Sequence, residues 1–415
     1  MQRSTPNSRR FSSASAEAIR ATADALLAGG VAVMPTDTVY GLAAHPSFPA
    51  ASSRIYDIKG RRQDKPIALL ASDADAPTRL GAAMPPMARA LAKRFWPGAL
   101  TLVLDVPGGT EGFRVPDSDT ARAIIATCGG LLRVTSANFS GEPAVAVFAE
   151  IPESLVAQCD AAVDGGPCPG GVPSAVVKVA ADGAVTILRE GPHEITDFIK
   201  SRMRFLVSAG PTREFIDPVR FISNRSTGRM GFAVAAAAAA AGHEVVLVAG
   251  PVTLPTPEGV RRIDVVTARD MLAALEGNID AADALVMTAA VADWRPAEMA
   301  AAKLKKREMS PSIALVPNPD ILKALAPHKG KRVFVGFAAE TGGPDAEAAR
   351  KLDEKGLDFI CANDVTRPGA GFGTETNIVN IFGHGGFRDD MPLMAKSDIA
   401  KRIVELAERK WTGKI

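Results

Sequence analysis

The stretch SAGPTREFIDPVRFISNRSTGRMG, residues 208–231, decides the fold of the second half of the chain. An apolar run precedes it, and a helix-like run of alanines, residues 233–241, follows it. A strand, a glycine-rich turn and a helix place backbone N–H groups against an anion. The loop lacks the G-x-G-x-x-G spacing of a dinucleotide fingerprint. A packing turn is the alternative, but Arg213, Arg220 and Asn224 favour an anion or nucleotide site at the top of an α/β sheet.

The composition indicates an ordinary globular protein of several domains. A length of 415 residues predicts two or three domains. Only 5% of the residues are aromatic while Ala and Gly are abundant, which favours α/β layers over an all-β sandwich. The net charge of +2 gives no global field that points to nucleic acid. No apolar run is long enough to span a membrane, so we expect no membrane partner.

The cysteines and the first fifteen residues indicate in which cellular compartment the protein is expected. Cys128, Cys159, Cys168 and Cys361 show no C-x-x-C spacing, which predicts free thiols in a reducing compartment and a cytoplasmic protein. Residues 1–15 are basic and rich in serine, and no hydrophobic core follows them. A transit peptide can look like this, but we expect a disordered N-terminus.

Periodicity and breaks divide the chain into a first domain at 16–192, a linker at 193–203 and a second domain at 204–415. The second domain alternates strands with helical segments, which predicts a Rossmann-like doubly wound parallel sheet. Its expected strands are 205–208, 244–249, 284–288, 332–337, 357–362 and 378–382, before a final helix at 397–409. The first domain is expected to be α/β, with helices at 16–27 and 85–95 and strands at 31–34, 67–70, 100–104, 131–134, 174–179 and 185–189.

Polar side chains in the first domain gather where strands and helices are expected to end, which is where sites form on α/β scaffolds. Several cations among small hydroxyl and amide groups suit a polyphosphate and a carboxylate. A solvated basic face is an equally good interpretation of the cluster at residues 59–65. No Ser/His/Asp triad and no metal-ligand spacing is evident.

These motifs resemble the YrdC/TsaC family of L-threonylcarbamoyladenylate synthases over about residues 16–191. The resemblance is carried by PTDTVYGL at 35–42, Lys59-x-Arg61, the WPG turn at 96–98, the RVP at 114–116, the S-x-N ending at residue 138 and the LREG at 188–191. It implies a twisted α/β domain that makes threonylcarbamoyl-AMP from L-threonine, bicarbonate and ATP for tRNA modification. Family members commonly carry S-T-V-V-D where residues 174–178 read SAVVK, and Arg62 and Arg133 are further departures.

The same resemblance implies roles for individual residues. ATP would be held by Lys59, Arg61, Ser136, Asn138 and Arg189. Threonine would lie near Thr38, Arg114 and Ser174.

The second domain carries further polar groups at its strand ends. Residues 289–294, AAVADW, follow an expected strand, and a turn of small residues lets a flat base or a sugar approach the backbone. The basic run at 303–307 suits a triphosphate, although such a run is most often a solvated face. Residues 318–322 begin a helix. Lys351 and Lys355 share one helix face because they lie four residues apart.

This domain resembles the CoaB-type phosphopantothenoylcysteine synthetases from about residue 203 to the end. The resemblance implies that 4′-phosphopantothenate is joined to L-cysteine with CTP through an acyl-cytidylate, in coenzyme A biosynthesis. The implied catalytic residues are Asn224, which turns over the acyl-cytidylate, Arg220 and Lys303. The implied CTP contacts are Ala289, Asp293, Lys303, Pro319, Asp320, Ile321, Leu322, Phe337, Lys351 and Lys355.

The resemblance also implies a homodimer and a cover for the site, both built by residues 363–373, and Mg²⁺ bound with CTP and with ATP. No flavin is expected. The preference for CTP over ATP follows from the resemblance and not from the residues.

Two alternatives remain open. The first domain could be a catalytically degenerate RNA-binding module attached to an active ligase. The second could be a nicotinamide dehydrogenase, although the missing G-x-G-x-x-G speaks against it.

Overall fold

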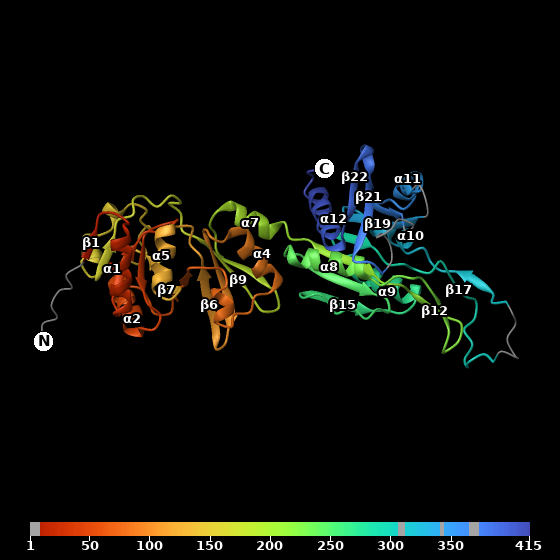
Figure 1. Cartoon of the computed structure of the whole chain (residues 1–415), viewed down its shortest axis with the longest axis horizontal. Helices are drawn as coiled ribbons and strands as arrows, with labels where there is room; N and C mark the ends of the chain where they lie inside the picture. The colour runs from red at the N-terminus through yellow and green to blue at the C-terminus, as the bar shows by residue number, and fades with distance from the viewer. Residues whose placement is uncertain (1–8, 306–311, 341–343, 365–372) are drawn as a thin grey trace. The chain divides into compact units, whose positions relative to one another are not determined.

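The computed structural model describes residues 9–305, 312–340, 344–364 and 373–415. The chain divides into two compact α/β units, Met1–Lys200 and Ser201–Ile415 (Figure 1). The predicted α/β class is confirmed for both units. Among the described residues, no helix combines the length and the apolar character that crossing a membrane requires.

One mixed sheet forms the centre of the first unit. Its strand order is β1 (Arg9–Phe11), β8 (Ala161–Val163), β2 (Val31–Met34), β3 (Gly41–Ala44), β7 (Leu131–Ser136), β4 (Leu69–Ala71), β6 (Gly109–Arg114), β5 (Leu100–Val106), β9 (Ala175–Val179) and β10 (Val185–Arg189). Helices α1 (Ala16–Leu27) and α5 (Asp119–Thr127) pack over β2 and β7, α2 (Pro49–Lys59) covers β3, and α4 (Pro86–Phe95) covers β5. Short helices α3 (Ala76–Arg79) and α6 (Glu153–Val156) join these elements.

The local signals explain which elements the sequence predicted. Helix α1 has the predicted bounds because the Ser15 side chain accepts a hydrogen bond from the Ala18 N–H at 3.2 Å and Gly29, with φ of 81°, follows the helix. Strand β3 was missed because GLAA lacks β-branched residues, and the strand forms by burial of every residue. Helix α5 was also missed, although the Ser118 side chain caps it.

Two segments outside the expected domain core pack on the first unit. Strand β1, inside the segment expected to be disordered, pairs in parallel with β8. Helix α7 (His193–Lys200), expected in the linker, buries Ile195 in the same apolar cluster as Trp96 and Leu100. Its Phe198 ring meets the Phe95 ring edge-on, with centroids 5.6 Å apart. The compact unit therefore extends to Lys200.

The second unit is a doubly wound sheet, as predicted. Its strand order is β15 (Val260–Asp264), β14 (Glu244–Ala249), β11 (Arg204–Ala209), β16 (Ala284–Met287), β19 (Val333–Glu340), β20 (Phe359–Asp364), β21 (Thr376–Gly383) and β22 (Arg388–Ala395). The run from β15 to β20 is parallel, and β21 and β22 extend it as an antiparallel hairpin. Helices α8 (Arg229–Ala240) and α12 (Lys396–Trp411) share one apolar core, and α9 (Ala268–Ile279), α10 (Ile321–Leu325) and α11 (Pro344–Glu354) lie in a second core.

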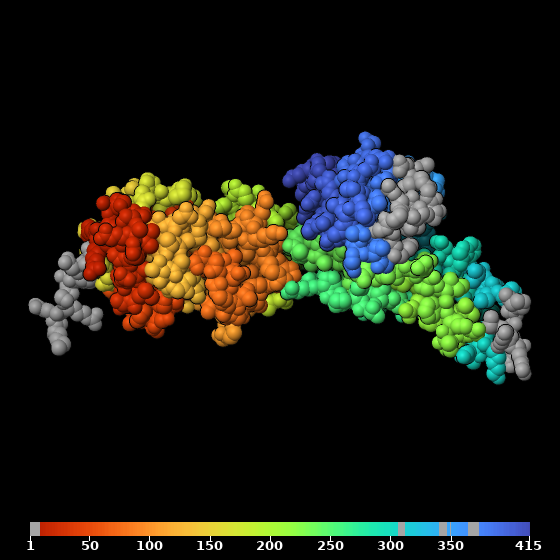
Figure 2. Space-filling model, viewed as in Figure 1, coloured from red at the N-terminus to blue at the C-terminus, as the bar shows by residue number. Residues whose placement is uncertain are grey.

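Two small antiparallel pairs project from this sheet and were not predicted. Strand β12 (Arg213–Phe215) pairs with β13 (Phe221–Ser223), and β17 (Trp294–Pro296) pairs with β18 (Leu315–Pro317). The β12 and β17 segments contact each other, and they adjoin as light green and cyan surface in Figure 2. Both pairs follow the carboxyl ends of central strands, so they frame the edge of the sheet where a site is expected.

Candidate functional site

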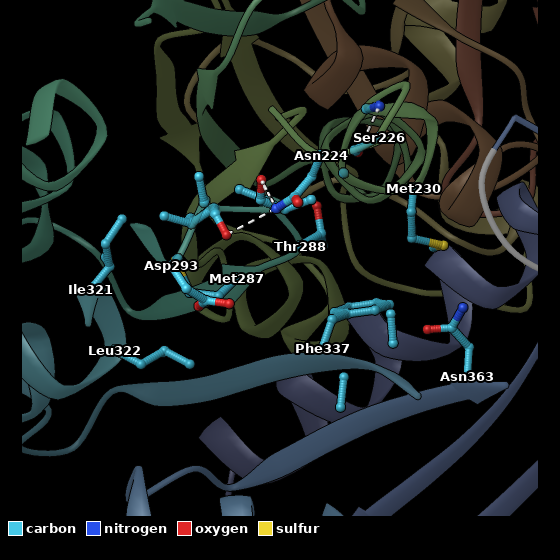
Figure 3. Close-up of a pocket in the computed structure, with 18 of the residues that line it drawn as sticks. Asn224, Ser226, Met230, Met287, Thr288, Asp293, Ile321, Leu322, Phe337 and Asn363 are labelled. Atoms are coloured by element: carbon cyan, nitrogen blue, oxygen red, sulfur yellow. Dashed lines mark hydrogen bonds between the residues drawn. The ribbon is translucent and has the colours of Figure 1, made fainter. Parts of the chain in front are cut away.

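The strand order of the second unit places a site between β11 and β16. From β11 the chain adds β14 and β15 on one side, then returns to add β16 and β19 on the other. Ligands of open α/β sheets bind at the carboxyl ends of the strands at such a reversal. A cavity of about 670 Å³ lies there, lined by residues 224–231 after β11 and 287–293 after β16 (Figure 3).

Glycines bring helix α8 against the sheet at this point. Gly228 has φ of 78° and precedes the helix, whose first residues line the cavity. A Cβ on Gly231 would lie 2.4 Å from Thr288 Oγ1 and 2.6 Å from Ala209 Cβ, so only glycine permits this approach. The first turn of α8 therefore lines the cavity, and the unpaired N–H groups of a helix's first turn suit an anion.

Asn224 is held by the loop that follows β16. Its Nδ2 donates to Ala290 O at 3.1 Å and to Val291 O at 3.0 Å (Figure 3). Since both amide protons are committed to carbonyls, Oδ1 is the atom that remains to accept a hydrogen bond. Asn224 thus joins the two loops that wall the cavity.

The lysines predicted to bind the nucleotide line the cavity beside acidic groups. Lys355 Nζ lies 3.4 Å from Asp320 Oδ2, and Lys351 Nζ lies 3.3 Å from Glu347 Oε1. Asp320 also caps α10 by accepting from Lys323 N at 3.2 Å. The predicted residues that line the cavity are Asn224, Ala289, Asp293, Pro319, Asp320, Ile321, Leu322, Phe337, Lys351 and Lys355.

Arg220 and Lys303, both predicted to be catalytic, are not among the cavity-lining residues. Arg220 pairs with the buried carboxylate of Asp217, with Nε at 2.9 Å from Oδ2. Leu304 is bound at both ends of its main chain, because its N–H donates to Asp217 Oδ2 at 3.2 Å and its carbonyl accepts from Arg220 Nη2 at 2.9 Å. The Arg220 hydrogen bonds hold the pKa of Asp217 well below its ordinary value, with help from backbone N–H groups. This pair fixes the segment that carries the exposed Lys303.

Sequence reasoning missed two polar residues that line the cavity, Asn377 and Lys396, whereas Asn363, which also lines it, belongs to the region predicted to cover the site. Lys396 is buried, and its Nζ donates to Thr374 O at 2.6 Å. Burial and then the charge of Arg229 lower its pKa. Lys396 is the first residue of the last helix. A lysine at the start of a helix is expected to be exposed to solvent, and only the position of the β21–β22 hairpin explains its burial. Of the predicted dimer and cover region 363–373, residues 365–372 lie outside the described residues.

The acidic groups of the cavity fit a magnesium ion that arrives with a nucleotide. Within the described ranges, no group of three His, Cys, Asp or Glu side chains could form a protein metal cage. The cavity offers the carboxylates of Asp293 and Asp320. Mg²⁺ is usually held by one or two carboxylates together with substrate phosphates, so these two residues suit such an ion.

The first unit has its own cavity of about 580 Å³ along the sheet. Arg114 crosses one end of it and is almost completely buried. Its guanidinium donates to Gly98 O at 3.0 Å, to Thr38 Oγ1 at 2.9 Å and to the carboxylate of Asp37. Ser174 Oγ lies 2.9 Å from Thr101 Oγ1 at the same end. This end offers hydroxyls and the N–H groups of a fixed guanidinium, whose charge Asp37 balances, to a small polar ligand.

Two of the residues predicted to bind ATP lie behind the cavity wall. Lys59 is buried, and its Nζ donates to the carbonyls of Ser136 and Asn138. Burial, and then the charge of Arg61, lowers the Lys59 pKa to about 8. Asn138 Nδ2 donates to Glu142 O at 2.7 Å, so both residues shape the loop behind the wall. The predicted residues that line this cavity are Thr38, Arg61, Arg114, Ser136, Ser174 and Arg189.

The unexpected charge at Arg133 has a partner. Its guanidinium binds both carboxylate oxygens of Glu111, at 3.1 and 2.7 Å, and donates to Ile67 O at 2.7 Å. The pair links β7 to β6 across the end of β4, so Arg133 is accommodated by the sheet. Lys178, the other departure in charge, lines the cavity.

The parallel run of strands, the cavity at its switch point and the helix N-terminus that lines this cavity define a doubly wound α/β protein. Residues 201–410 match the family described as DNA/pantothenate metabolism flavoprotein C-terminal domain. The chain belongs to this family. Residues 24–191 match a second family, Sua5/YciO/YrdC, described as Telomere recombination.

Known proteins resemble the two halves separately. The coenzyme A biosynthesis bifunctional protein CoaBC of Bacillus subtilis is 46% identical over 211 residues, which are 50% of this chain and 52% of that protein. The chain therefore spans about half the length of this curated relative. A crystal structure of a CoaBC C-terminal domain has 38% identity and a TM-score of 0.45, over 51% of this chain and 98% of that one. A double mutant of P. abyssi Sua5 has 26% identity and a TM-score of 0.43, over 49% of this chain and 71% of that one.

The predicted CoaB-type second half and YrdC-like first half are confirmed as domains. The threonylcarbamoyladenylate synthase activity of the first half stays a prediction, as do CTP use, RNA binding and dimerisation.

Proposed function

We propose that the second half of the chain is a phosphopantothenate–cysteine ligase that activates its acid substrate with CTP. The observation that carries this proposal is the cavity at the sheet reversal, which is lined by the first turn of α8 and by Lys351 and Lys355. The B. subtilis relative, named for coenzyme A biosynthesis, supports the substrate class through its 46% identity. Aligned N–H groups and lysines suit a polyphosphate.

The proposed reaction has two steps. A carboxylate oxygen of 4′-phosphopantothenate attacks the α-phosphorus of CTP, and the bond to pyrophosphate breaks. The cysteine amine then attacks the acyl carbon of the acyl-cytidylate, CMP leaves with the electron pair of the broken C–O bond, and the amine proton passes to solvent. The protein mainly positions reactants and neutralises charge. Magnesium would neutralise phosphate charge when CTP binds, and Asp293 and Asp320 are the residues that would hold it.

Asn224 has its proposed role in the second step. Its Nδ2 donates to two carbonyls, so Oδ1 is free to accept a hydrogen bond from the cysteine amine and to orient that amine. Asn224→Ala then removes the acceptor without removing the phosphate-binding groups.

Time courses of pyrophosphate and CMP test this role in the full-length protein. We expect Asn224→Ala to release about one equivalent of pyrophosphate per enzyme in a burst and then to form CMP at least tenfold more slowly than the wild type. Asn278→Ala, on α9 and outside the cavity lining, is the matched control and should behave as the wild type. If Asn224→Ala lowered the burst and the steady rate together, the assignment to the second step would be wrong.

We also propose that the first half forms threonylcarbamoyl-AMP from L-threonine, bicarbonate and ATP. The observation in favour is the second cavity, where Arg114, Thr38 and Ser174 gather at one end and Arg61 and Arg189 also line the wall. Arg114 is preorganised to meet a carboxylate because its side chain is already fixed by three partners.

Threonine-dependent pyrophosphate release from ATP tests this second proposal. We expect release to be lost in Ser174→Ala and Arg189→Ala and kept in Lys93→Ala, an exposed residue of α4. Salt-dependent RNA binding without such release would instead support a catalytically degenerate RNA-binding module. CTP-dependent release by the other half should be unchanged in all three variants.

A further inference from the structure

Two of the charged residues that line the cavity of the first unit are neutralised by neighbours. Arg114 forms a buried ion pair with Asp37, whose side chain is 8% exposed. Glu111 is bound by both arms of Arg133. Neither pair leaves a net charge for a ligand.

Three other cations that line this cavity have no carboxylate partner among the described residues: Arg61, Lys178 and Arg189. Arg61 donates to two main-chain carbonyls at 3.1 and 3.2 Å, and Arg189 donates to Ser174 O at 2.7 Å. Carbonyls satisfy the N–H groups but cancel no charge. Burial lowers the pKa of Arg189, and the charges of Arg114 and Arg61 lower it further. The cavity therefore concentrates positive charge that an anionic ligand can balance.

The register of the sheet places these cations around a row of small side chains. Lys178 on β9 lies opposite Val103 on β5, and Val103 lies opposite Gly112 on β6. A Cβ on Gly112 would lie 3.2 Å from Ala68 Cβ. Three strand spacings separate Lys178 from Ala68, which is about 14 Å. At the far end of this row, the Arg61 guanidinium binds the main chain just before Ala68.

We propose that this row is a polyphosphate trough and that Lys178 binds the terminal phosphate. The inference rests on the proposed nucleotide chemistry of the first half and adds the residue that binds the last phosphate of the nucleotide. A chain of phosphates can lie over valine, glycine and alanine, with Arg61 and Arg189 beside it and Lys178 at its end.

Thermal unfolding with a unit-specific probe tests this proposal. The sequence has three tryptophans, and Trp294 and Trp411 are exposed in the second unit, whereas Trp96 is buried in the first. In a Trp294→Phe, Trp411→Phe background, Trp96 fluorescence follows the first unit alone. Inorganic tripolyphosphate and ATP should raise the midpoint temperature of this transition. The dependence of that temperature on ligand concentration gives the Kd of each ligand.

We expect Lys178→Ala to weaken the binding of tripolyphosphate and ATP about tenfold, because a charged hydrogen bond is lost. Lys178→Glu should weaken their binding about a hundredfold, because the glutamate also repels the phosphate. Lys178→Arg should restore binding, Lys93→Ala should not change it, and AMP, which lacks the terminal phosphates, should bind all variants equally. Unchanged tripolyphosphate affinity in Lys178→Glu would overturn the proposal. If binding depended on Lys178 but the protein made no threonylcarbamoyl-AMP, the proposed trough would stand and the proposed activity would be wrong. The two proposals can therefore fail separately.

Discussion

Gly231→Ala measures how closely the second unit depends on the contact between α8 and β11. The new Cβ would lie 2.4 Å from Thr288 Oγ1, 2.6 Å from Ala209 Cβ and 2.8 Å from Ser208 O. Ser208 and Ala209 belong to β11 and Thr288 directly follows β16, so α8 must move outward. The 2.6 Å hydrogen bond from Thr288 Oγ1 to Ser208 O is then strained or lost.

The expected loss of stability can be worked out term by term. Overpacking costs about 2 kcal/mol, and the lost hydrogen bond costs about 1 kcal/mol. Replacing a helical glycine by alanine returns about 0.5–1 kcal/mol. The net loss is about 2 kcal/mol, which lowers the Tm of a unit of this size by about 4–8 °C. Because the first turn of α8 moves with the helix, the KM for CTP should rise as well.

Differential scanning calorimetry of the full chain provides the measurement, with the transition of the second unit identified by its shift on addition of CTP and phosphopantothenate. Gly277→Ala is the matched control, since it also lies in a helix and its Cβ would meet nothing within 4 Å. That variant should gain about 0.5–1 kcal/mol. If Gly231→Ala were as stable as Gly277→Ala, the argument from close packing would fail.

Three further predictions concern buried charges. Arg114→Ala should lower the stability of the first unit by about 3–5 kcal/mol, because Asp37 is left buried without its cation; urea unfolding followed by Trp96 fluorescence checks this, and a loss below 1 kcal/mol would contradict it. Asp217 has a folded-state pKa below its ordinary 3.8, so its contribution is present above pH 4 and is lost as the pH falls through the folded pKa. Asp217→Asn should therefore lower the Tm at pH 7 and flatten its decline between pH 5 and about 2; equal slopes in calorimetry would refute this. Lys59 has a folded pKa of about 8 against an ordinary 10.5, so its folded form binds fewer protons between these values and its contribution to stability rises with pH there. The Tm of Lys59→Met relative to the wild type should fall from pH 8 to 10, and a constant difference would speak against the shift.

Local signals in the sequence predicted most of the scaffold but not the long-range pairings. The helix at Ala16–Leu27 and the strand at Val31–Met34 have the predicted bounds because a cap, a glycine stop and an apolar run mark them. Strand β3 was missed because GLAA has little propensity of its own and its partner β7 is distant in sequence. The β12–β13 and β17–β18 pairs were missed because strands of three residues are too short to show an alternating pattern.

In the candidate sites, too, residues next to predicted strands were placed correctly, whereas those that depend on distant contacts were not. Residues 289–293 line a cavity as expected because they follow the parallel strand β16, and Phe337 lines it from within the second half of β19. Arg220 was placed in the cavity by its motif, but its distance from the wall depends on the ion pair with Asp217, which no local pattern reveals. Lys396 reaches the cavity only through the antiparallel hairpin, whose direction the sequence did not specify.

The hairpin β21–β22 has a consequence for the order in which the molecule is made. It returns the chain so that Lys396, the first residue of α12, completes the cavity begun by the loop after β11. On the ribosome, the pocket of the first unit can assemble once Arg189 has emerged, because all its walls have then been synthesised. The pocket of the second unit must wait until Lys396 has emerged, which is 207 residues later. A nascent chain therefore holds a finished first site beside a partly built sheet.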